Sequence, residues 1–398
     1  MSVLPRDLEH TARTCHGVER LRNVPSSANL LRVILAYAVS DLSLKDTAAW
    51  AKATGIADFT GQAFHYRLQK CEKWLEHLLG QLLFRDPPQN PSSFPIRVVD
   101  GSVITGPGSK GTDWVAHMIV DPASGQFTSV EVTDCRGAET YTRHPVNPGE
   151  STLGDRMYAT ARGIEYVVNR KAHPLVRVNP YNLKICDLNR QRIHLESYEA
   201  RVLEKGIISL DVLIPTPPDN LKKNRPWKLK NAKSWIPARI VGGRTKKGVI
   251  WVLTTLSREQ LSDEGVLKLY RFRRQIELLF KRLKSLLHLD ELPTRDGPIS
   301  KSWLLGRLLA AAIAQTLVNP AGPFPRRGRP QRRRISRQSQ CLVKIQSNLV
   351  GTEVCDLWRW SLASDHQGAK PQDARWFQTT QKNRHPSEDE TMTGKTLF

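Results

Sequence analysis

One helical segment constrains the fold of this chain more than any other. Its sequence from Leu269 to Ser285, LYRFRRQIELLFKRLKS, places apolar residues at helical spacing and predicts a helix, within about Asp263–Leu289, that packs on a core. The apolar face holds Phe272, Ile276, Leu279, Phe280, Leu283, Leu286 and Leu287. Four polar residues form a narrow stripe on the other side, with two more cations beside it: Tyr270, Arg273, Glu277 and Lys284, flanked by Arg274 and Lys281.

The single carboxylate of this stripe has two explanations. Glu277 and Lys281 are four residues apart, so they could form an ion pair on a solvated basic face. Glu277 could take part in metal binding or catalysis only if other carboxylates lie close to it at rigid positions, such as the ends of strands. Two residues fit that requirement. Asp100 closes an apolar strand at residues 96–99, and Asp155 precedes a predicted helix.

Three carboxylates from two strands and a helix, with neither His nor Cys among them, suit hard cations that prefer oxygen ligands. We expect Asp100, Asp155 and Glu277 to bind two Mg²⁺ ions, with Mn²⁺ as a possible substitute. Two such ions about 4 Å apart can activate a water or a 3′-hydroxyl for in-line attack on a phosphodiester. Arg273 and Lys284 would then hold DNA phosphates that the carboxylates alone would repel.

The net charge indicates the same kind of partner. The chain has 60 Lys and Arg against 38 Asp and Glu, a formal net charge of +22, which favours a polyanion or an anionic membrane surface. Pro218–Lys247 holds ten basic residues and one acid, interleaved with Trp227 and Trp235, as on surfaces that follow a nucleic-acid strand. Phe324–Arg337 adds seven arginines in 14 positions. Plain solvated faces are the alternative for both runs.

Cysteine spacing and hydropathy exclude other classes. The six cysteines form no CxxC pair, so neither a zinc ribbon nor a disulfide framework is expected. The first residues lack the apolar region of a signal peptide. The longest apolar stretch, Trp303–Val318, is about 16 residues long and contains Arg307, whereas a membrane-spanning helix needs about 20. We therefore expect a buried helix there and no membrane partner.

Periodicity divides the rest of the chain into a helical N-terminal part and a strand-rich middle. Leu44–Thr54 and Gly61–Lys73 have the outline of a helix-turn-helix that could recognise DNA, although most helical hairpins are only packing units. Asp86–Ser93 contains three prolines and is predicted to be a linker. Strands are predicted at Phe94–Asp100, Trp114–Val120, Phe127–Val132, around Leu153, and at Leu175–Val178, Ile207–Ile214, Ala238–Val241 and Val249–Thr255. With a helix predicted at Met157–Asn169, the fold class is α/β with a mixed sheet.

These motifs resemble those of a known family. Tyr270-x2-Arg273-x3-Glu277-x6-Lys284 is similar to the Y-x2-R-x3-E-x6-K signature of DDE transposases of insertion-sequence family four. The sequences around Asp100 and Asp155, VDGS and GDRMY, resemble the motifs of the first two acids in that family. The resemblance implies that Asp100, Asp155 and Glu277 are a catalytic triad on a ribonuclease-H-like fold. Arg274 and Met157 depart from residues frequent in the family without touching the three acids.

The resemblance also accounts for the long interval between the second and third acids, 277 − 155 = 122 positions. Such transposases carry a β-rich insertion there, in which a Trp on the last strand is associated with a base flipped out of the DNA end. Trp251 is similar in position to that residue, and an aromatic platform suits a flipped base. Strand alternation equally allows Trp251 to be a core residue beside Val249 and Leu253.

The resemblance implies a transposase that excises an insertion sequence and transfers its strands. We expect DNA as partner, both the element's terminal inverted repeats and the target, with a homodimer in the synaptic complex and a bacterial cytoplasmic location. The alternatives are a non-catalytic DNA-binding protein derived from a transposase and a ribonuclease-H-like nuclease. The predicted domains are a helical N-terminal DNA-binding domain (1–86), a catalytic core (94–180 and 257–320), a β-rich insertion (181–256) and a basic, then polar tail (321–398).

Overall fold

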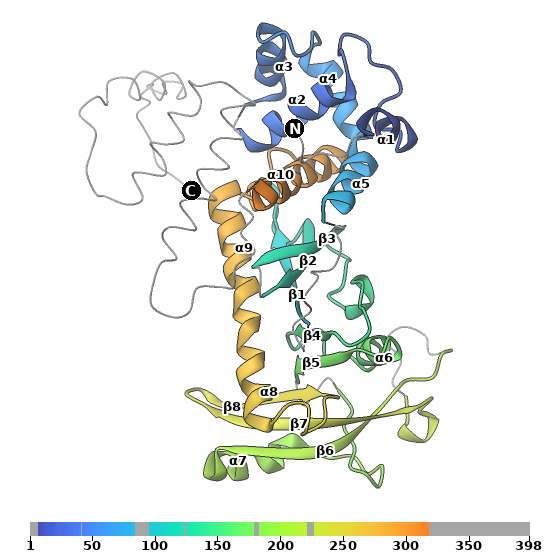
Figure 1. The fold of residues 1–398 in the computed structure, drawn as a ribbon, viewed down its shortest axis with the longest axis vertical. Coiled ribbons are helices and arrows are strands. Elements are labelled where there is room, and N and C mark those ends of the chain that lie inside the picture. The colour runs from blue at the N-terminus through green and yellow to red at the C-terminus, as the bar shows by residue number, and fades with distance from the viewer. Residues whose placement is uncertain are drawn as a thin grey trace, which may run out of the picture.

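We describe the fold from a computed structural model, which places residues 7–40, 42–83, 95–122, 125–178, 183–220 and 227–317. Helices gather at one end of the molecule, strands run through its middle, and a long helix lies beside them (Figure 1). The predicted linker Asp86–Ser93, the arginine-rich segment Phe324–Arg337 and part of the basic run, residues 221–226, lie outside the described residues.

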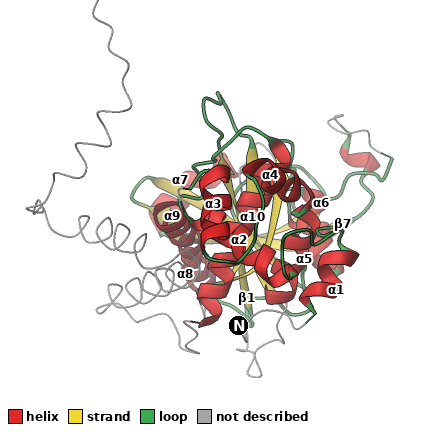
Figure 2. Ribbon diagram, turned by 90° about the horizontal axis from the view of Figure 1, so that it is seen from above, coloured by secondary structure: helices red, strands yellow, loops and turns green. Residues whose placement is uncertain are grey.

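The helical end combines the first five helices with the last one, as the view from above shows (Figure 2). The helices are α1 (Leu8–Thr14), α2 (Ser27–Val39), α3 (Leu44–Ala53), α4 (Gly61–Lys70), α5 (Glu72–Leu83) and α10 (Gly297–Leu317). Ser26, Ser43 and Thr60 cap α2, α3 and α4, because each side chain accepts an N–H from the first turn. α10 packs against α2, α4 and α5. The predicted helix-turn-helix hairpin therefore packs on a helix that comes much later in the sequence.

The strands form one mixed sheet, so the predicted α/β class is confirmed. Its order is β3-β2-β1-β4-β5-β8-β7-β6, with β1, β4 and β5 parallel and the other pairs antiparallel. The strands are β1 (Ile96–Ile104), β2 (Trp114–Asp121), β3 (Gln126–Asp134), β4 (Ser151–Gly154), β5 (His173–Arg177), β6 (Ile207–Pro215), β7 (Trp235–Thr245) and β8 (Gly248–Thr254). Because β5 pairs with β8, the strands of the segment 181–256 continue the same sheet.

The two faces of the sheet bury separate cores. Val98 and Val252 belong to the core that includes the helical end, whereas their chain neighbours Val99 and Leu253 belong to the other core. This alternation follows from the two-residue period of a strand. The second core is covered by α6 (Ala161–Asn169) and α7 (Glu199–Lys205). Both faces of the sheet are therefore covered, and the central strand β4 is buried at every residue.

Several predicted helices differ in their bounds. The helix predicted at Gly61–Lys73 ends at Lys70, and the one predicted from Trp303 begins at Gly297. α6 begins at Ala161 rather than Met157, because Asp155 accepts the N–H of Met157 in a turn and Thr160 caps the helix instead. The segment predicted as one helix over 263–289 is α8 (Asp263–Tyr270), a 3₁₀ turn (Arg271–Arg273) and α9 (Arg274–Leu287). A 3₁₀ turn advances about 120° per residue rather than about 100°.

That change in twist moves one predicted core residue out of the core. Phe272 lies in the 3₁₀ turn and its side chain is 42% exposed, so its assignment to the apolar face was wrong. Ile276, Leu279, Phe280, Leu283 and Leu287 are buried as predicted. Among the described residues no helix is long and apolar enough to cross a membrane, and α10, which contains the apolar stretch, is largely buried.

Candidate active site

Strand pairing brings the two aspartates side by side. Val98 of β1 pairs with Leu153 of β4 in parallel, and Asp100 and Asp155 each follow two residues later. Asp100 was expected to close its strand, but β1 continues to Ile104 because Gly101 to Ile104 pair with β2. Only the parallel pairing with β4 ends before Asp100. The aspartate therefore lies within a strand at the point where its neighbour strand ends, which fixes its backbone on one side.

Gly154 sets the position of Asp155. A Cβ at Gly154 would lie 2.6 Å from the Tyr141 hydroxyl and 2.8 Å from the Tyr158 Cβ, so two buried rings occupy the space that any side chain would need. The Oδ1 atom of Asp155 accepts the backbone N–H of Met157 at 2.7 Å. Packing behind the strand and a turn in front of it thus fix this carboxylate beside Asp100.

Arg273 joins all three predicted carboxylates. Its Nη2 lies 3.1 Å from Asp100 Oδ2 and 3.9 Å from Asp155 Oδ2, and its Nη1 forms an ion pair with Glu277 Oε1. The side chains grow more exposed outward, from 11% for Asp100 to 22% for Asp155 and 51% for Glu277. We call these three acids the carboxylate cluster. Glu277 pairs with Arg273 four residues before it, and not with Lys281 as the alternative reading of the helix supposed.

The electrostatics of the cluster are unbalanced. Burial raises the pKa of Asp100 to about 6, Arg273 lowers it, and the negative charges of Asp155 and Glu277 raise it again. A guanidinium that bridges several acids normally lowers their pKa values, so burial and crowding outweigh it here. The Nε atom of Arg273 is itself buried and has no hydrogen-bond partner among the described residues. The cluster therefore has more acid than its one bridging cation compensates.

A fourth acid next to the cluster escaped the sequence prediction. The Glu139 carboxylate lies against Gly101, because a Cβ at Gly101 would be 2.5 Å from its Oε1 atom. Burial, together with the charges of Asp100 and Asp155, raises the pKa of Glu139 to about 7. Glu139 sits in the loop between β3 and β4, where no periodicity or strand end marks it. The small residue after Asp100 was the one available sign that another group approaches there.

The remaining predicted residues of the stripe lie at the end of α8 and on α9. Lys284 donates from Nζ to the Val103 carbonyl of β1 at 3.1 Å. Tyr270 is buried, which raises its pKa to about 12. Arg274 and Lys281 are exposed beside the stripe, as the helical pattern predicted. The structure thus brings Tyr270, Arg273, Glu277 and Lys284 to the edge of the sheet that holds Asp100.

Trp251 lies in the core instead of on a surface. Its side chain is 3% exposed and packs on Gly242, where a Cβ would come within 2.4 Å of the indole ring. Gly242 and Trp251 are paired across β7 and β8, so the glycine makes room for the ring. This position matches the core alternative that strand alternation allowed. In this structure Trp251 offers no open platform for a base.

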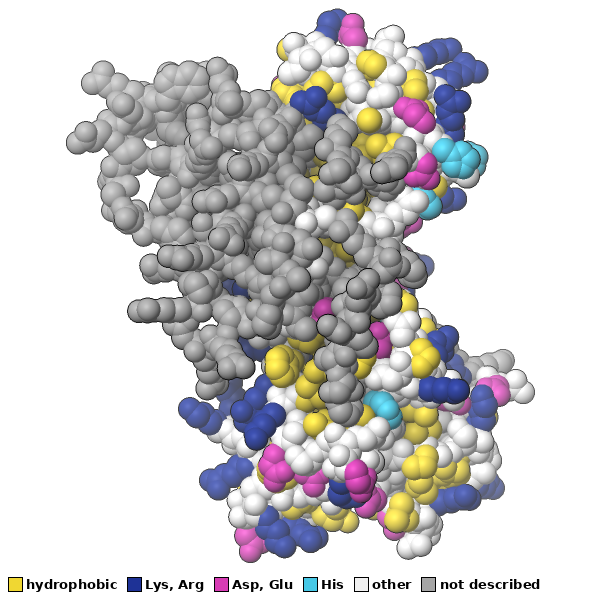
Figure 3. Space-filling view, in the orientation of Figure 1, with side chains coloured by type: hydrophobic (Ala, Val, Ile, Leu, Met, Phe, Trp, Pro, Cys, Tyr) yellow, Lys and Arg dark blue, Asp and Glu magenta, His cyan; other side chains and the backbone are white. Residues whose placement is uncertain are grey.

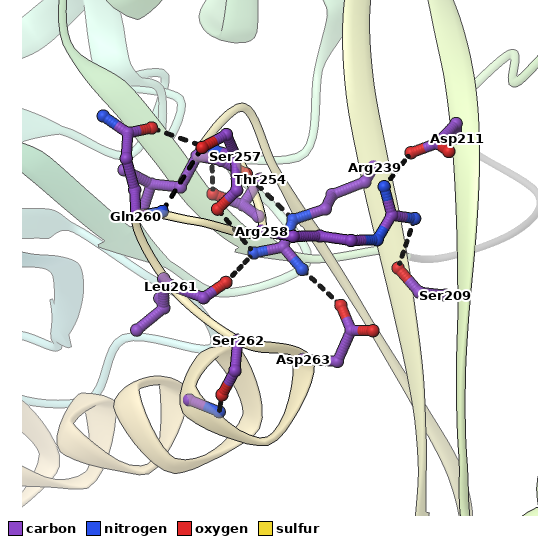
Figure 4. A network of polar contacts seen from close by, with 12 residues as sticks. Ser209, Asp211, Arg239, Thr254, Ser257, Arg258, Gln260, Leu261, Ser262 and Asp263 are labelled. Atoms are coloured by element: carbon purple, nitrogen blue, oxygen red, sulfur yellow. Dashed lines mark hydrogen bonds and ion pairs between the residues drawn. The ribbon is translucent and has the colours of Figure 1, made fainter.

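A second arginine orients the start of the helical segment that carries Arg273. Arg239 of β7 donates to the carbonyls of Leu256, at 2.8 Å, and Ser257, at 3.3 Å, and also contacts the Leu261 carbonyl and the Asp263 carboxylate (Figure 4). These groups form the loop between β8 and α8. Arg239 came from the basic run expected to contact DNA, but its side chain is only 4% exposed, so it holds this loop.

The other described cations of the basic run lie on the surface. They are exposed in the loop before β7 and at the β7–β8 turn: Lys228, Lys230, Lys233, Arg244, Lys246 and Lys247. Figure 3 shows Lys and Arg side chains gathered around the end of the molecule that holds β6, β7 and β8. Their positive charge attracts a polyanion to the end of the sheet from which α8 and α9 start.

The donor types of the cluster suit a divalent cation, but their present arrangement does not. Three carboxylates offer the oxygen ligands that Mg²⁺ and Mn²⁺ prefer. Among the described residues, however, no group of three or more His, Cys, Asp or Glu is placed to hold a metal ion. The guanidinium of Arg273 contacts the same oxygens that a metal would need.

Comparison with known proteins gives one consistent family. Residues 91–313 match the family described as Transposase DDE domain. The transposase for insertion sequence element IS421 of Escherichia coli is 30% identical over 347 residues, which cover 81% of this chain and 93% of the relative. InsL of insertion sequence element IS186A of Escherichia coli strain K12 is 30% identical over 346 residues, with the same coverage. A piggyBac transposase in a synaptic complex with hairpin DNA has a TM-score of 0.44 at 11% identity, over 98% of this chain and 84% of that chain.

Proposed function

The chain belongs to the DDE transposase family and is a DNA transposase; from this premise we propose that Asp100, Asp155 and Glu277 are its catalytic carboxylates. The observation that carries the proposal is the contact of one guanidinium with all three acids. These acids come from β1, from the end of β4 and from α9, and they are far apart in the sequence. Their meeting at one sheet edge is what a shared chemical task requires.

We assign the chain more finely to insertion-sequence family four and its core to the ribonuclease-H-like fold. The spacing of Tyr270, Arg273, Glu277 and Lys284 supports the first assignment. The parallel pairing of β1 with β4, next to an antiparallel β1-β2-β3 ribbon, supports the second. The predicted domain bounds stay a prediction, because the sheet runs continuously across them.

The carboxylate cluster would hold Mg²⁺ or Mn²⁺ once Arg273 has left the oxygens. A divalent cation bound there would polarise the scissile phosphate and stabilise the leaving oxygen. The backbone contacts of Asp100 and Asp155 hold two of the three acids rigidly, whereas the exposed Glu277 on α9 can adjust. Glu139 adds negative charge behind Asp100 and would strengthen the attraction for a cation.

The reaction at the element end is hydrolysis followed by transesterification. A water oxygen forms a bond to phosphorus while the phosphorus–O3′ bond breaks, which leaves a 3′-hydroxyl and a 5′-phosphate. The 3′-hydroxyl then forms a new ester with another phosphodiester, whose own 3′ oxygen leaves. Attack on the opposite strand would give a hairpin, and attack on target DNA would give insertion. Lys284, Lys281 and Arg274 line the helix side along which flanking phosphates would lie.

The test uses the purified full-length protein and duplexes that end in the element's own terminal repeats. With Mg²⁺, the wild type should release 3′-hydroxyl ends, and Asp100→Ala should reduce cleavage by about a thousandfold or more, since transition-state electrostatics supply several kcal/mol. Glu264→Gln, which removes an exposed acid from α8, should cleave like the wild type. Equal cleavage by Asp100→Ala would overturn the assignment, and equal cutting of unrelated DNA without joining would favour a general nuclease.

A further inference from the structure

Arg273 occupies a position that contact with a DNA phosphate alone does not require. It lies at the centre of the carboxylate cluster, with Asp100 Oδ2 at 3.1 Å, Asp155 Oδ2 at 3.9 Å and Glu277 as an ion-pair partner. A residue that only bound DNA would point away from these acids toward solvent. In this structure Arg273 is instead the counter-ion of the acids.

A metal ion and this guanidinium would compete for the same oxygens. Mg²⁺ binds its oxygen ligands at about 2.0–2.1 Å with near-ideal geometry. A divalent cation at Asp100 Oδ2 would lie next to the positive guanidinium that donates to the same atom, and the two cations would repel each other. This agrees with the finding that, over the described part of the chain, no acidic group stands ready to hold a metal.

We propose that Arg273 is an exchangeable internal cation, which partly neutralises the carboxylate cluster without metal and is displaced toward a DNA phosphate when metal binds. The proposal rests on the proposed function of the cluster. It assigns Arg273 two successive partners, first the acids and then the substrate. Arg273 is thus a positioning residue whose movement couples metal loading to DNA engagement.

Three features of Arg273 suit such an exchange. Its side chain is 21% exposed, so a path to solvent exists. Its Nε donor is buried and has no acceptor among the described residues, so Arg273 would lose no hydrogen bond at Nε by leaving this position. The planar guanidinium also has two parallel N–H donors, which bind the oxygens of a phosphate as well as those of a carboxylate.

The exchange has a thermodynamic consequence. If metal and guanidinium exclude each other, removing the guanidinium must tighten metal binding, because the metal no longer displaces a resident cation. The opposite follows if Arg273 orders the acids for the metal: its removal would then weaken metal binding. The two possibilities therefore predict changes of opposite sign in one measurement, which needs no DNA and no catalysis.

The experiment measures Mn²⁺ binding to the DNA-free, full-length protein at pH 8 from the electron paramagnetic resonance signal of unbound Mn²⁺. Arg273→Gln should lower the Mn²⁺ dissociation constant about tenfold, a typical size for coupling between sites. Arg271→Gln is the matched control, because it removes the same charge from an exposed position two residues away and should stay within about twofold of the wild type. Arg273→Lys keeps a point charge without the fork and should fall between them, which keeps the test open if Arg273→Gln does not fold.

The outcomes separate two failures. If the wild type binds Mn²⁺ and Asp100→Asn loses it, but Arg273→Gln and Arg273→Lys bind it equally or more weakly than the wild type, the exchange is wrong and the catalytic assignment stands. If Asp100→Asn binds Mn²⁺ as the wild type does, the metal lies elsewhere, and both the assignment and the exchange are overturned.

Discussion

Two arginines, one in contact with the start of α8 and one in the turn that follows its end, show how differently one side chain can be used. Arg239 ties the loop before α8 to the sheet, and Arg273 lies in the 3₁₀ turn just after it. Arg239 is 4% exposed and donates mainly to backbone carbonyls. Arg273 is 21% exposed and contacts three carboxylates, while its Nε donor has no partner among the described residues.

The difference separates a structural site from a functional one. A backbone carbonyl cannot leave the loop to which it belongs, so Arg239 has no alternative partner and its contacts are permanent. Carboxylates can exchange an arginine for a metal ion, so the contacts of Arg273 are conditional. Buried polar groups with every donor satisfied stabilise a fold, whereas incompletely satisfied groups mark places where a ligand acts.

The largest effect on stability is expected at the structural arginine. Arg239→Leu would leave the Asp263 carboxylate and three carbonyls without their donor, which should lower the free energy of unfolding by about 3–5 kcal/mol. Arg258→Leu is the control: Arg258 pairs with Asp211 in the same region (Figure 4), but both side chains are about half exposed, so the loss should stay below about 1 kcal/mol. Urea unfolding followed by circular dichroism measures both. Equal losses would erase the distinction drawn from burial.

At the carboxylate cluster around Arg273 we expect the opposite effect: removal of one charge should raise the free energy of unfolding. Burial and neighbouring acids raise the pKa of Asp100 to about 6, above its usual value near 3.9. The folded protein therefore loses stability as pH rises from about 4 through about 6, because Asp100 must then ionise in its buried position. Asp100→Asn should therefore raise the free energy of unfolding at pH 8, without metal, by about 1–3 kcal/mol. The gain should shrink as pH falls from 6 toward 4.

The control for this comparison is Asp134→Asn, which removes an exposed acid from β3 and should change stability by less than about 0.5 kcal/mol. Thermal unfolding at pH 8 and pH 5 distinguishes the cases. A loss of stability for Asp100→Asn at pH 8 would show that Arg273 compensates the cluster fully, which contradicts the crowding inferred above.

The smallest effect is expected at Lys284, whose side chain contacts β1. Its Nζ makes one partly exposed hydrogen bond, to the Val103 carbonyl, so Lys284→Gln should lower the free energy of unfolding by about 0.5–1.5 kcal/mol. Its effect on DNA should be clearer: the slope of log binding constant against log salt should fall by about one unit. An unchanged slope would remove Lys284 from the proposed DNA surface.

The sequence was sufficient to predict the backbone positions of the acids but not their contacts. Asp100 and Asp155 each lie two residues beyond the pair Val98 and Leu153, and parallel pairing of β1 with β4 brings such positions together whatever the side chains do. The helical period likewise placed Glu277 and Arg273 on one face. It could not show that Arg273 turns inward, because that depends on the 3₁₀ turn and on acids more than 100 residues away in the chain.

Long-range packing also explains the errors. Arg239 belongs to a strongly basic run and was read as a DNA contact, yet strand pairing buries it beside the loop that starts α8. Glu139 lies in a loop without periodicity, so only the folded chain shows its approach to Gly101. Charge runs predict surfaces on average, and tertiary structure decides which members of a run are inside.

The most direct test of the proposed exchange at the carboxylate cluster is the position of Mn²⁺ in crystals of the full-length protein, located by anomalous scattering. We expect a peak between Asp100, Asp155 and Glu277, with the guanidinium of Arg273 moved away from Asp100 Oδ2, from which its Nη2 atom lies 3.1 Å without metal. A map with no peak among these acids at saturating Mn²⁺, and with Arg273 still bridging them, would contradict it.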